Sequence, residues 1–247
     1  MKRISMVALA LAAMFAFSVG SASAAQPVFY TIAEVGGTAP STIKLTGTLG
    51  AAFLEGKTSK SKITCTGGTA TGEVTGSKST KNNVTTFSGC EASGLKCNST
   101  GDPEGTIKTA ALEGVLGNVT ATLPGIRLFA PGEAGKKPKT GHLADFKCGG
   151  TLVNAEVTGS VIGSLSGASG KTPEEGKLAA SSKLTFAETA GKQKYESFLA
   201  GECGGNANDC GPEQLTSVIN GTPELGGQSV IATLKTTPFV GKLGVTK

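Results

Sequence analysis

The sequence predicts an all-β protein whose antiparallel sheets form a sandwich or a barrel-like body. Apolar residues alternate with polar ones in many short runs, 37 glycines interrupt or separate those runs, and long helical patterns are missing. Strand-rich chains of this size often form one domain. We therefore expect a single domain, with two pseudo-repeated halves inside it.

The longest alternating run covers residues 153–165. One face would carry Val153, Ala155, Val157, Gly159, Val161, Gly163 and Leu165, and the other Asn154, Glu156, Thr158, Ser160 and Ser164. A period of two over this length predicts a half-buried strand, or two strands that meet at a bend. Gly159 and Gly163 are the expected positions of the bend or of a bulge. Only Ile162 breaks the pattern.

Shorter runs of the same kind predict further strands on both sides of this segment. They cover residues 43–49, 119–123, 126–130, 184–186 and 230–234. Turn signals separate the runs, among them Thr38-Ala39-Pro40, Gly101-Asp102-Pro103, Pro131-Gly132 and Gly221-Thr222-Pro223. We expect about twelve to fifteen strands in all.

A faint repeat relates two segments of the chain. Cys65 is followed by Gly67-Gly68-Thr69 and Glu73-Val74-Thr75-Gly76-Ser77, and Cys148 is followed by Gly149-Gly150-Thr151 and Glu156-Val157-Thr158-Gly159-Ser160. The glutamate has the same offset from the cysteine in both copies. We interpret the copies as related β-hairpin halves, because two copies are too few for a solenoid.

Residues 1–24 have the pattern of a secretory signal peptide. Lys2 and Arg3 precede an apolar run from Met6 to Val19, and Ala22-Ser23-Ala24 matches a cleavage site. The sequence therefore predicts a secreted, extracellular domain at residues 25–247. The apolar run is too short for a membrane span, and we expect no span in the mature protein.

The charge balance argues against nucleic acid as a partner. The chain has 23 basic and 18 acidic residues, and the net charge of +5 falls to +3 without Lys2 and Arg3. Arg127 is the only arginine that remains, and base or phosphate recognition depends on arginine. Lys136, Lys137 and Lys139 predict a solvated basic loop. Attraction of that loop to a cell-wall or other extracellular polymer stays open, and the partner is otherwise unknown.

All six cysteines lie after the predicted signal peptide, and an even count in this context favours three disulfides. Sequence alone allows fifteen connectivities. The repeat places Cys65 and Cys148 at equivalent strand starts, whereas an up-down-up meander would put Cys65 and Cys90 at opposite ends, too far apart to bond. We therefore predict the pairs Cys65–Cys148, Cys90–Cys97 and Cys203–Cys210.

The chain resembles a family of uncharacterised secreted proteins of high-GC actinobacteria. The resemblance is carried by Ile63-Thr64-Cys65, Gly72-Glu73-Val74-Thr75-Gly76, Gly89-Cys90-Glu91, Gly94-Leu95-Lys96-Cys97, Leu112-Glu113-Gly114-Val115-Leu116-Gly117, Phe146-Lys147-Cys148-Gly149, Val157-Thr158-Gly159-Ser160-Val161-Ile162-Gly163 and Gly191-Lys192-Gln193. It spans most of the predicted mature chain. It implies no activity and no catalytic residue, and Cys203 and Cys210 look like additions to the family's four cysteines.

Catalytic constellations are scarce. A Ser/His/Asp triad would need His142, the only histidine, but Asp145 lies three residues on and should face the other side of a strand. Glu73 and Glu156 are pseudo-equivalent in the repeat, so they are the carboxylate pair that a glycoside hydrolase would use. We expect each of them instead on the solvent face of its strand.

Metal sites are equally weak. No C-x-x-C pair accompanies His142, which argues against zinc. Asn206-Ala207-Asn208-Asp209, with Glu213 nearby, offers oxygen ligands for Ca²⁺ in an incomplete pattern. A surface turn closed by Cys203 and Cys210 explains the segment better. We predict no catalytic, cofactor-binding or metal-binding residue.

These observations favour a secreted, disulfide-stabilised, non-enzymatic β-protein that binds a partner or contributes to the extracellular layer or cell envelope. The alternative is a secreted hydrolase that uses Glu73 and Glu156 on a glycan-type substrate.

Overall fold

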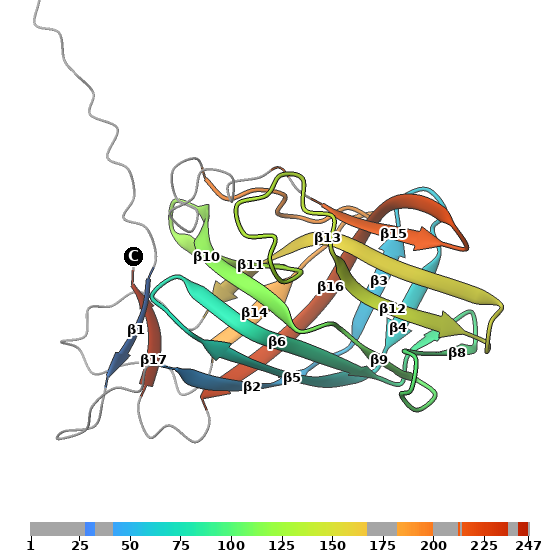
Figure 1. The fold of residues 1–247 in the computed structure, drawn as a ribbon, viewed down its shortest axis with the longest axis horizontal. Coiled ribbons are helices and arrows are strands. Elements are labelled where there is room, and N and C mark those ends of the chain that lie inside the picture. The colour runs from blue at the N-terminus through green and yellow to red at the C-terminus, as the bar shows by residue number, and fades with distance from the viewer. Residues whose placement is uncertain are drawn as a thin grey trace, which may run out of the picture.

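A computed structural model describes residues 28–32, 42–166, 182–199, 212, 214–236 and 242–246. The predicted signal peptide, Cys203 and Cys210, the 206–209 segment and Glu213 lie outside these residues. The described part of the chain consists of strands and their connections (Figure 1). It contains no helix long and apolar enough to cross a membrane.

The predicted all-β class is confirmed, in a single domain. The strands are β1 (Val28–Ile32), β2 (Ile43–Leu49), β3 (Ala52–Gly56), β4 (Lys62–Cys65), β5 (Gly67–Val74), β6 (Ser79–Ser88), β7 (Glu91–Ala92), β8 (Leu95–Asn98), β9 (Thr106–Lys108), β10 (Leu112–Thr120), β11 (Leu123–Phe129), β12 (His142–Cys148), β13 (Val153–Ser166), β14 (Ser182–Phe186), β15 (Leu215–Ile219), β16 (Thr222–Thr236) and β17 (Lys242–Thr246). β1 pairs with β17 in a small separate sheet, and the other fifteen strands form one sheet.

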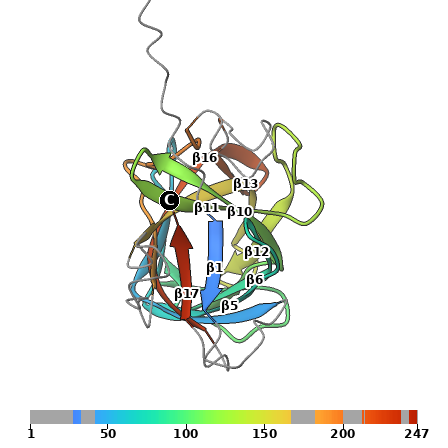
Figure 2. The same cartoon turned by 90° about the vertical axis from the view of Figure 1, so that its left-hand side faces the viewer.

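The large sheet is antiparallel throughout and closes on itself twice, so it is barrel-like rather than a sandwich. Ring one runs β2–β5–β6–β10–β11–β13–β14–β16 and returns to β2. Ring two runs β3–β4–β7–β8–β12–β13–β15–β16 and returns to β3. The strands surround a common long axis, with β1 and β17 at its near end in Figure 2.

The two rings share the long strands β13 and β16, which run along the body (Figure 1). β13 passes from ring two to ring one at Gly159: before this residue its partners are β12 and β15, and after it they are β11 and then also β14. Gly159 has a φ of +98°, and a Cβ there would lie 2.2 Å from the carbonyl oxygen of Gln214. Only glycine fits this bend, as the alternating pattern of residues 153–165 indicated.

Ile162, the exception to that pattern, is buried on the outer face of β13. It packs with Val119 and Phe198 in a second apolar cluster, against which Tyr195 also packs. Arg127 is fully buried beside it, with its guanidinium carbon 5.2 Å from the centroid of the Phe198 ring. The guanidinium is therefore enclosed by the protein and has a structural role here.

The structure contains two disulfides among the described residues, Cys65–Cys90 and Cys97–Cys148, so the predicted pairs Cys65–Cys148 and Cys90–Cys97 are wrong. One hairpin, β5–β6, separates Cys65 from Cys90, not a three-stranded meander. The hairpin returns the chain to its starting end, where Gly67 pairs with Ser88. Cys97 lies directly opposite Cys148 across β8 and β12.

The internal repeat in the sequence corresponds to different strand pairings. Gly67-Gly68-Thr69 begins β5, which pairs with β2 and β6. Gly149-Gly150-Thr151 instead forms the turn of the β12–β13 hairpin. The matching residues therefore do not mark two equivalent hairpins.

Candidate functional site

The interior of the double ring contains an apolar cavity of about 130 Å³ that is partly open. Ring one contributes residues such as Leu45, Ile126, Leu184 and Ala232, and ring two contributes residues such as Phe53, Ile63, Phe146 and Val157. An eight-stranded ring is just wide enough for side chains to fill it or for one small ligand to occupy it. The space here is close in size to an engineered cavity that holds benzene.

Small residues on the inner face leave this space open. Ala52 and Ala232 are buried and line the cavity, as does Gly72 on β5. On β16 the inward positions alternate as Gln228, Val230, Ala232 and Leu234. A period of two therefore places short and branched side chains next to one another on the same wall.

One wall of the cavity is polar. Asn83, Thr85 and Phe87 alternate along β6 and all line the cavity, together with Thr80 at the other side of a bulge and Thr109 after β9. The Thr109 hydroxyl oxygen accepts a hydrogen bond of 2.9 Å from the backbone N–H of Thr85. The Thr109 hydroxyl hydrogen remains available to a ligand.

Asn83 is held in a defined orientation. Its Nδ2 donates to the hydroxyl oxygen of Thr80 at 2.9 Å and to the carbonyl oxygen of Leu112 at 3.0 Å. These two bonds use both amide hydrogens and leave Oδ1 as an acceptor. Oδ1 lies over Gly72, where an added Cβ would come within 2.4 Å of it.

None of the described residues that line the cavity is charged. Gln228 supplies a further neutral amide from β16. Burying an ionised ligand without a partner of opposite charge costs several kcal/mol. The cavity is therefore suited to neutral molecules.

Glu73 and Glu156 do not share a site. Each lies between inward-facing neighbours and points to the outer face. Their strands, β5 and β13, are four steps apart in either direction around ring one, on opposite walls. The placement agrees with the expected solvent faces and gives no support to a carboxylate-pair hydrolase.

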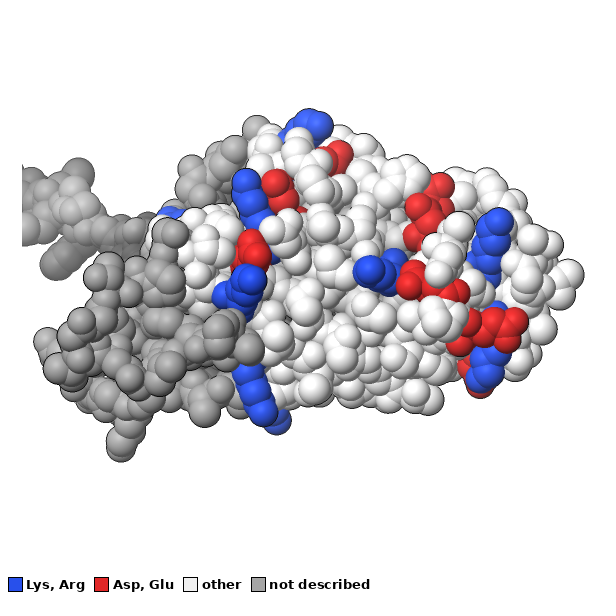
Figure 3. Space-filling model, turned by 60° about the horizontal axis from the view of Figure 1, so that its bottom comes forward, with Lys and Arg blue, Asp and Glu red and all other residues white. Residues whose placement is uncertain are grey.

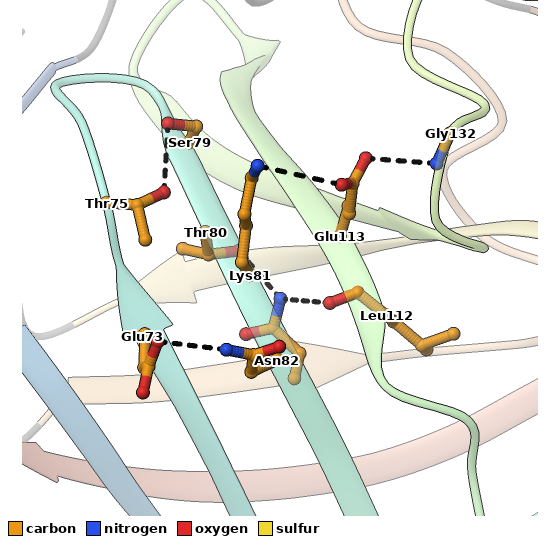
Figure 4. A network of polar contacts seen from close by, with 10 residues as sticks. Glu73, Thr75, Ser79, Thr80, Lys81, Asn82, Leu112, Glu113 and Gly132 are labelled. Carbon is orange, nitrogen blue, oxygen red and sulfur yellow. Dashed lines mark hydrogen bonds and ion pairs between the residues drawn. The ribbon is translucent and has the colours of Figure 1, made fainter.

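Glu73 belongs to a polar network that ties neighbouring strands together on the outside of ring one (Figure 4). Its Oε2 accepts a hydrogen bond of 3.0 Å from Asn82 Nδ2. Nearby, Lys81 Nζ lies 3.9 Å from Glu113 Oε1, and Glu113 Oε2 accepts from the backbone N–H of Gly132. This arrangement explains these side chains as strand-to-strand contacts.

The expectation that His142 and Asp145 face opposite sides of a strand is wrong. A bulge between His142 and Ala144 shifts the register against β13, so both side chains lie on the outer face. His142 Nδ1 is 3.6 Å from Asp145 Oδ1 and 3.2 Å from Glu156 Oε1. The three side chains are exposed or half-exposed, and such surface contacts contribute about 0–1 kcal/mol. Among the described residues, His142 thus contacts two carboxylates.

The basic loop is only partly solvated. Lys136 and Lys137 are exposed, as predicted, but Lys139 is buried. Its Nζ donates to the carbonyl oxygens of Glu133 and Lys136 at 3.1 and 3.0 Å. Lys139 therefore holds the loop together from inside and contributes little to a basic surface.

Charged side chains elsewhere on the surface are sparse and mixed in sign. On the face in Figure 3, lysines and acidic residues form small groups separated by wide uncharged regions. Lys96 pairs with Glu91 at 3.1 Å, and Lys62 lies 3.8 Å from Glu55. The described part of the face in Figure 3 shows no single-sign patch.

Sequence reasoning missed the cavity and its polar wall. The run Asn82-Asn83-Val84-Thr85-Thr86-Phe87 has polar residues on both faces, so alternation does not say which face is internal. Phe87 is the one signal that marks the inner face, because Asn83 and Thr85 lie at alternate positions from it and therefore on the same face of the strand.

No family model matches the chain, and the comparisons with curated proteins and with solved structures also found no match. The resemblance to secreted actinobacterial proteins stays a prediction.

Proposed function

We propose that this protein is a secreted, non-enzymatic binding protein that holds a small apolar molecule inside its double ring. The observation that carries the proposal is the interior cavity of about 130 Å³, whose described lining residues are uncharged and belong to a closed antiparallel sheet. Leaving such a volume empty costs on the order of 3 kcal/mol at about 24 cal/mol per Å³. An apolar occupant restores the lost contacts.

The secreted location rests on the signal-peptide pattern of residues 1–24 and on two disulfides, which persist in oxidising compartments. The disulfides strengthen the wall of ring two where its strands are shortest, at β4, β7 and β8. A stapled, closed scaffold keeps the cavity formed in the absence of ligand. Ligand binding then costs the protein little conformational entropy.

Thermal unfolding in the presence of toluene tests the proposal. At a free concentration about 100 times its dissociation constant, a ligand stabilises the folded state by about 2.7 kcal/mol. For a protein of this size we expect the Tm to rise by roughly 5–10 °C.

Ala232→Phe is the matched blocking variant, because it places a benzene-sized ring in a benzene-sized cavity. We expect this variant to lose the response to toluene. The control is Thr233→Phe on the same strand, since Thr233 is absent from the cavity lining and should leave the response intact. An unchanged Tm of the wild-type protein in saturating toluene would overturn the proposal.

A further inference from the structure

The polar wall favours a bound molecule that can form hydrogen bonds, which a purely apolar cavity would not. It contains Asn83, whose Oδ1 is left as an acceptor, and Thr85 and Thr109, whose hydroxyl groups can donate as well as accept. The rest of the lining is almost entirely apolar. A hydrocarbon would cover these polar groups without replacing their hydrogen bonds, which is unfavourable.

The acceptor at Asn83 is fixed and cannot rotate freely to suit a different ligand. Both Nδ2 hydrogens are already used, by Thr80 and by the Leu112 carbonyl. Exchanging the positions of Oδ1 and Nδ2 would break the bond to the Leu112 carbonyl and set Oδ1 against that carbonyl oxygen, which cannot donate. The wall therefore calls for a ligand group that donates a hydrogen bond to Asn83.

A carboxylate cannot meet this requirement, because it only accepts hydrogen bonds when ionised. The described lining also lacks any cation that would offset its burial. A hydroxyl group donates and accepts, remains neutral, and matches both Asn83 and the threonines. Cavity volume limits the remainder of the molecule to about the size of one benzene ring.

We propose that the occupant is a small neutral phenol or alcohol, bound with its hydroxyl group donating to Asn83 Oδ1 and its apolar part directed toward the opposite wall. This inference rests on the proposed function, since it names the ligand class for the same cavity. It makes Asn83, Thr85 and Thr109 specificity-determining residues.

The test compares the dissociation constants of toluene, phenol and benzoate by calorimetric titration of the full-length protein. Toluene and phenol have the same number of heavy atoms, so their ratio isolates the hydroxyl group. We expect phenol to bind about fivefold to tenfold more tightly than toluene, as one net hydrogen bond provides. Benzoate should show no binding.

Two variants locate the hydroxyl group. Asn83→Leu should reduce the preference for phenol over toluene to near unity while toluene binding persists. Thr85→Val keeps the side-chain shape and should reduce the preference by a smaller factor. Thr86→Val is the matched control, because Thr86 is the next residue on β6 and does not line the cavity.

The outcomes separate the two proposals. If neither toluene nor phenol binds, the proposed function fails and this inference fails with it. If toluene binds and phenol has no advantage, or if Asn83→Leu and Thr85→Val leave the advantage unchanged, only this inference is overturned. Benzoate binding as tight as phenol binding would also overturn it. Should Asn83→Leu not fold, Thr85→Val and the wild-type comparison still decide the question.

Discussion

Glu224 on β16 is a residue whose charge holds a turn in place. Its carboxylate accepts hydrogen bonds from the backbone N–H groups of Thr58 and Ser59, at 2.7 and 2.8 Å, and from the Ser59 hydroxyl. These residues form the connection between β3 and β4. Burial raises the pKa of Glu224, but the hydrogen bonds from Ser59 and Thr58 and the nearby Lys60 charge lower it more, so the pKa lies below its ordinary value.

A lowered pKa makes the contribution of Glu224 dependent on pH. The stabilisation is fully present above the unfolded-state pKa of about 4.3, and it is lost as the pH falls through the lower pKa of the folded state. We expect Glu224→Gln to reduce the free energy of unfolding by about 1 kcal/mol at pH 7. Urea unfolding between pH 7 and pH 2 measures this difference, which should shrink toward acid pH.

Glu104 supplies the control, since it is an exposed carboxylate in the connection between β8 and β9. Glu104→Gln should leave stability unchanged at every pH. An effect of Glu224→Gln that stayed constant down to pH 2 would show that its charge is not involved.

Single-residue environments were the hardest feature to predict from the sequence. The outward positions of Glu73 and Glu156 follow from alternation, because their neighbours are apolar or glycine. The orientation of Asn83 does not follow, since it depends on the carbonyl of Leu112 from another strand. The contacts of Glu224 likewise join segments far apart in the chain.

Gly159 is where a single element, β13, changes from one ring to the other. It combines a positive φ with a Gln214 carbonyl oxygen that occupies the place where a Cβ would lie. Gly159→Ala should therefore lower the free energy of unfolding by about 2–4 kcal/mol, through backbone strain and a steric clash together. Denaturant unfolding at neutral pH measures the loss.

Gly221→Ala separates the two contributions. Gly221 also has a positive φ, of +81°, but an added Cβ would meet no atom within 4 Å. We expect this variant to cost about 1 kcal/mol from strain alone. Equal losses in the two variants would contradict the role assigned to the Gln214 contact.

The sequence predicted elements well where one face is uniformly apolar. β13 has the alternation, the bend and the length expected of it. The bulge in β12 was not predictable, because Leu143 and Ala144 both face inward and only the register against β13 shows this. Local pattern gives the inner face of a regular strand and fails where an extra residue interrupts the period.

At the scale of the whole molecule, closure of the rings depends on pairings between distant segments. β6 pairs with β10, and β2 pairs with β16 near the other end of the chain. Alternation identifies strands but does not determine which strands pair. The sequence therefore could not distinguish a sandwich from a barrel-like arrangement. The wrong prediction of the cysteine pairs has the same cause, because it was based on a different number of strands between Cys65 and Cys90.

The observed disulfides make a prediction about the whole scaffold. Peptide mapping by mass spectrometry without reduction should recover Cys65 linked to Cys90 and Cys97 linked to Cys148. In the chain-entropy model the loops of 25 and 51 residues correspond to about 3.5 and 4 kcal/mol. Replacing either pair by serine should therefore lower the Tm substantially. Recovery of Cys65 linked to Cys148 would contradict this arrangement of ring two.

The central claim is that the double ring encloses a binding cavity, and NMR contacts to bound toluene test it most directly. Intermolecular nuclear Overhauser effects should connect toluene protons with methyl groups of Leu45, Ile126 and Val157, which line the cavity from three different strands. Contacts confined to exposed side chains such as Leu152 and Ile231 would contradict the claim, because they would place the ligand on the outside of the protein.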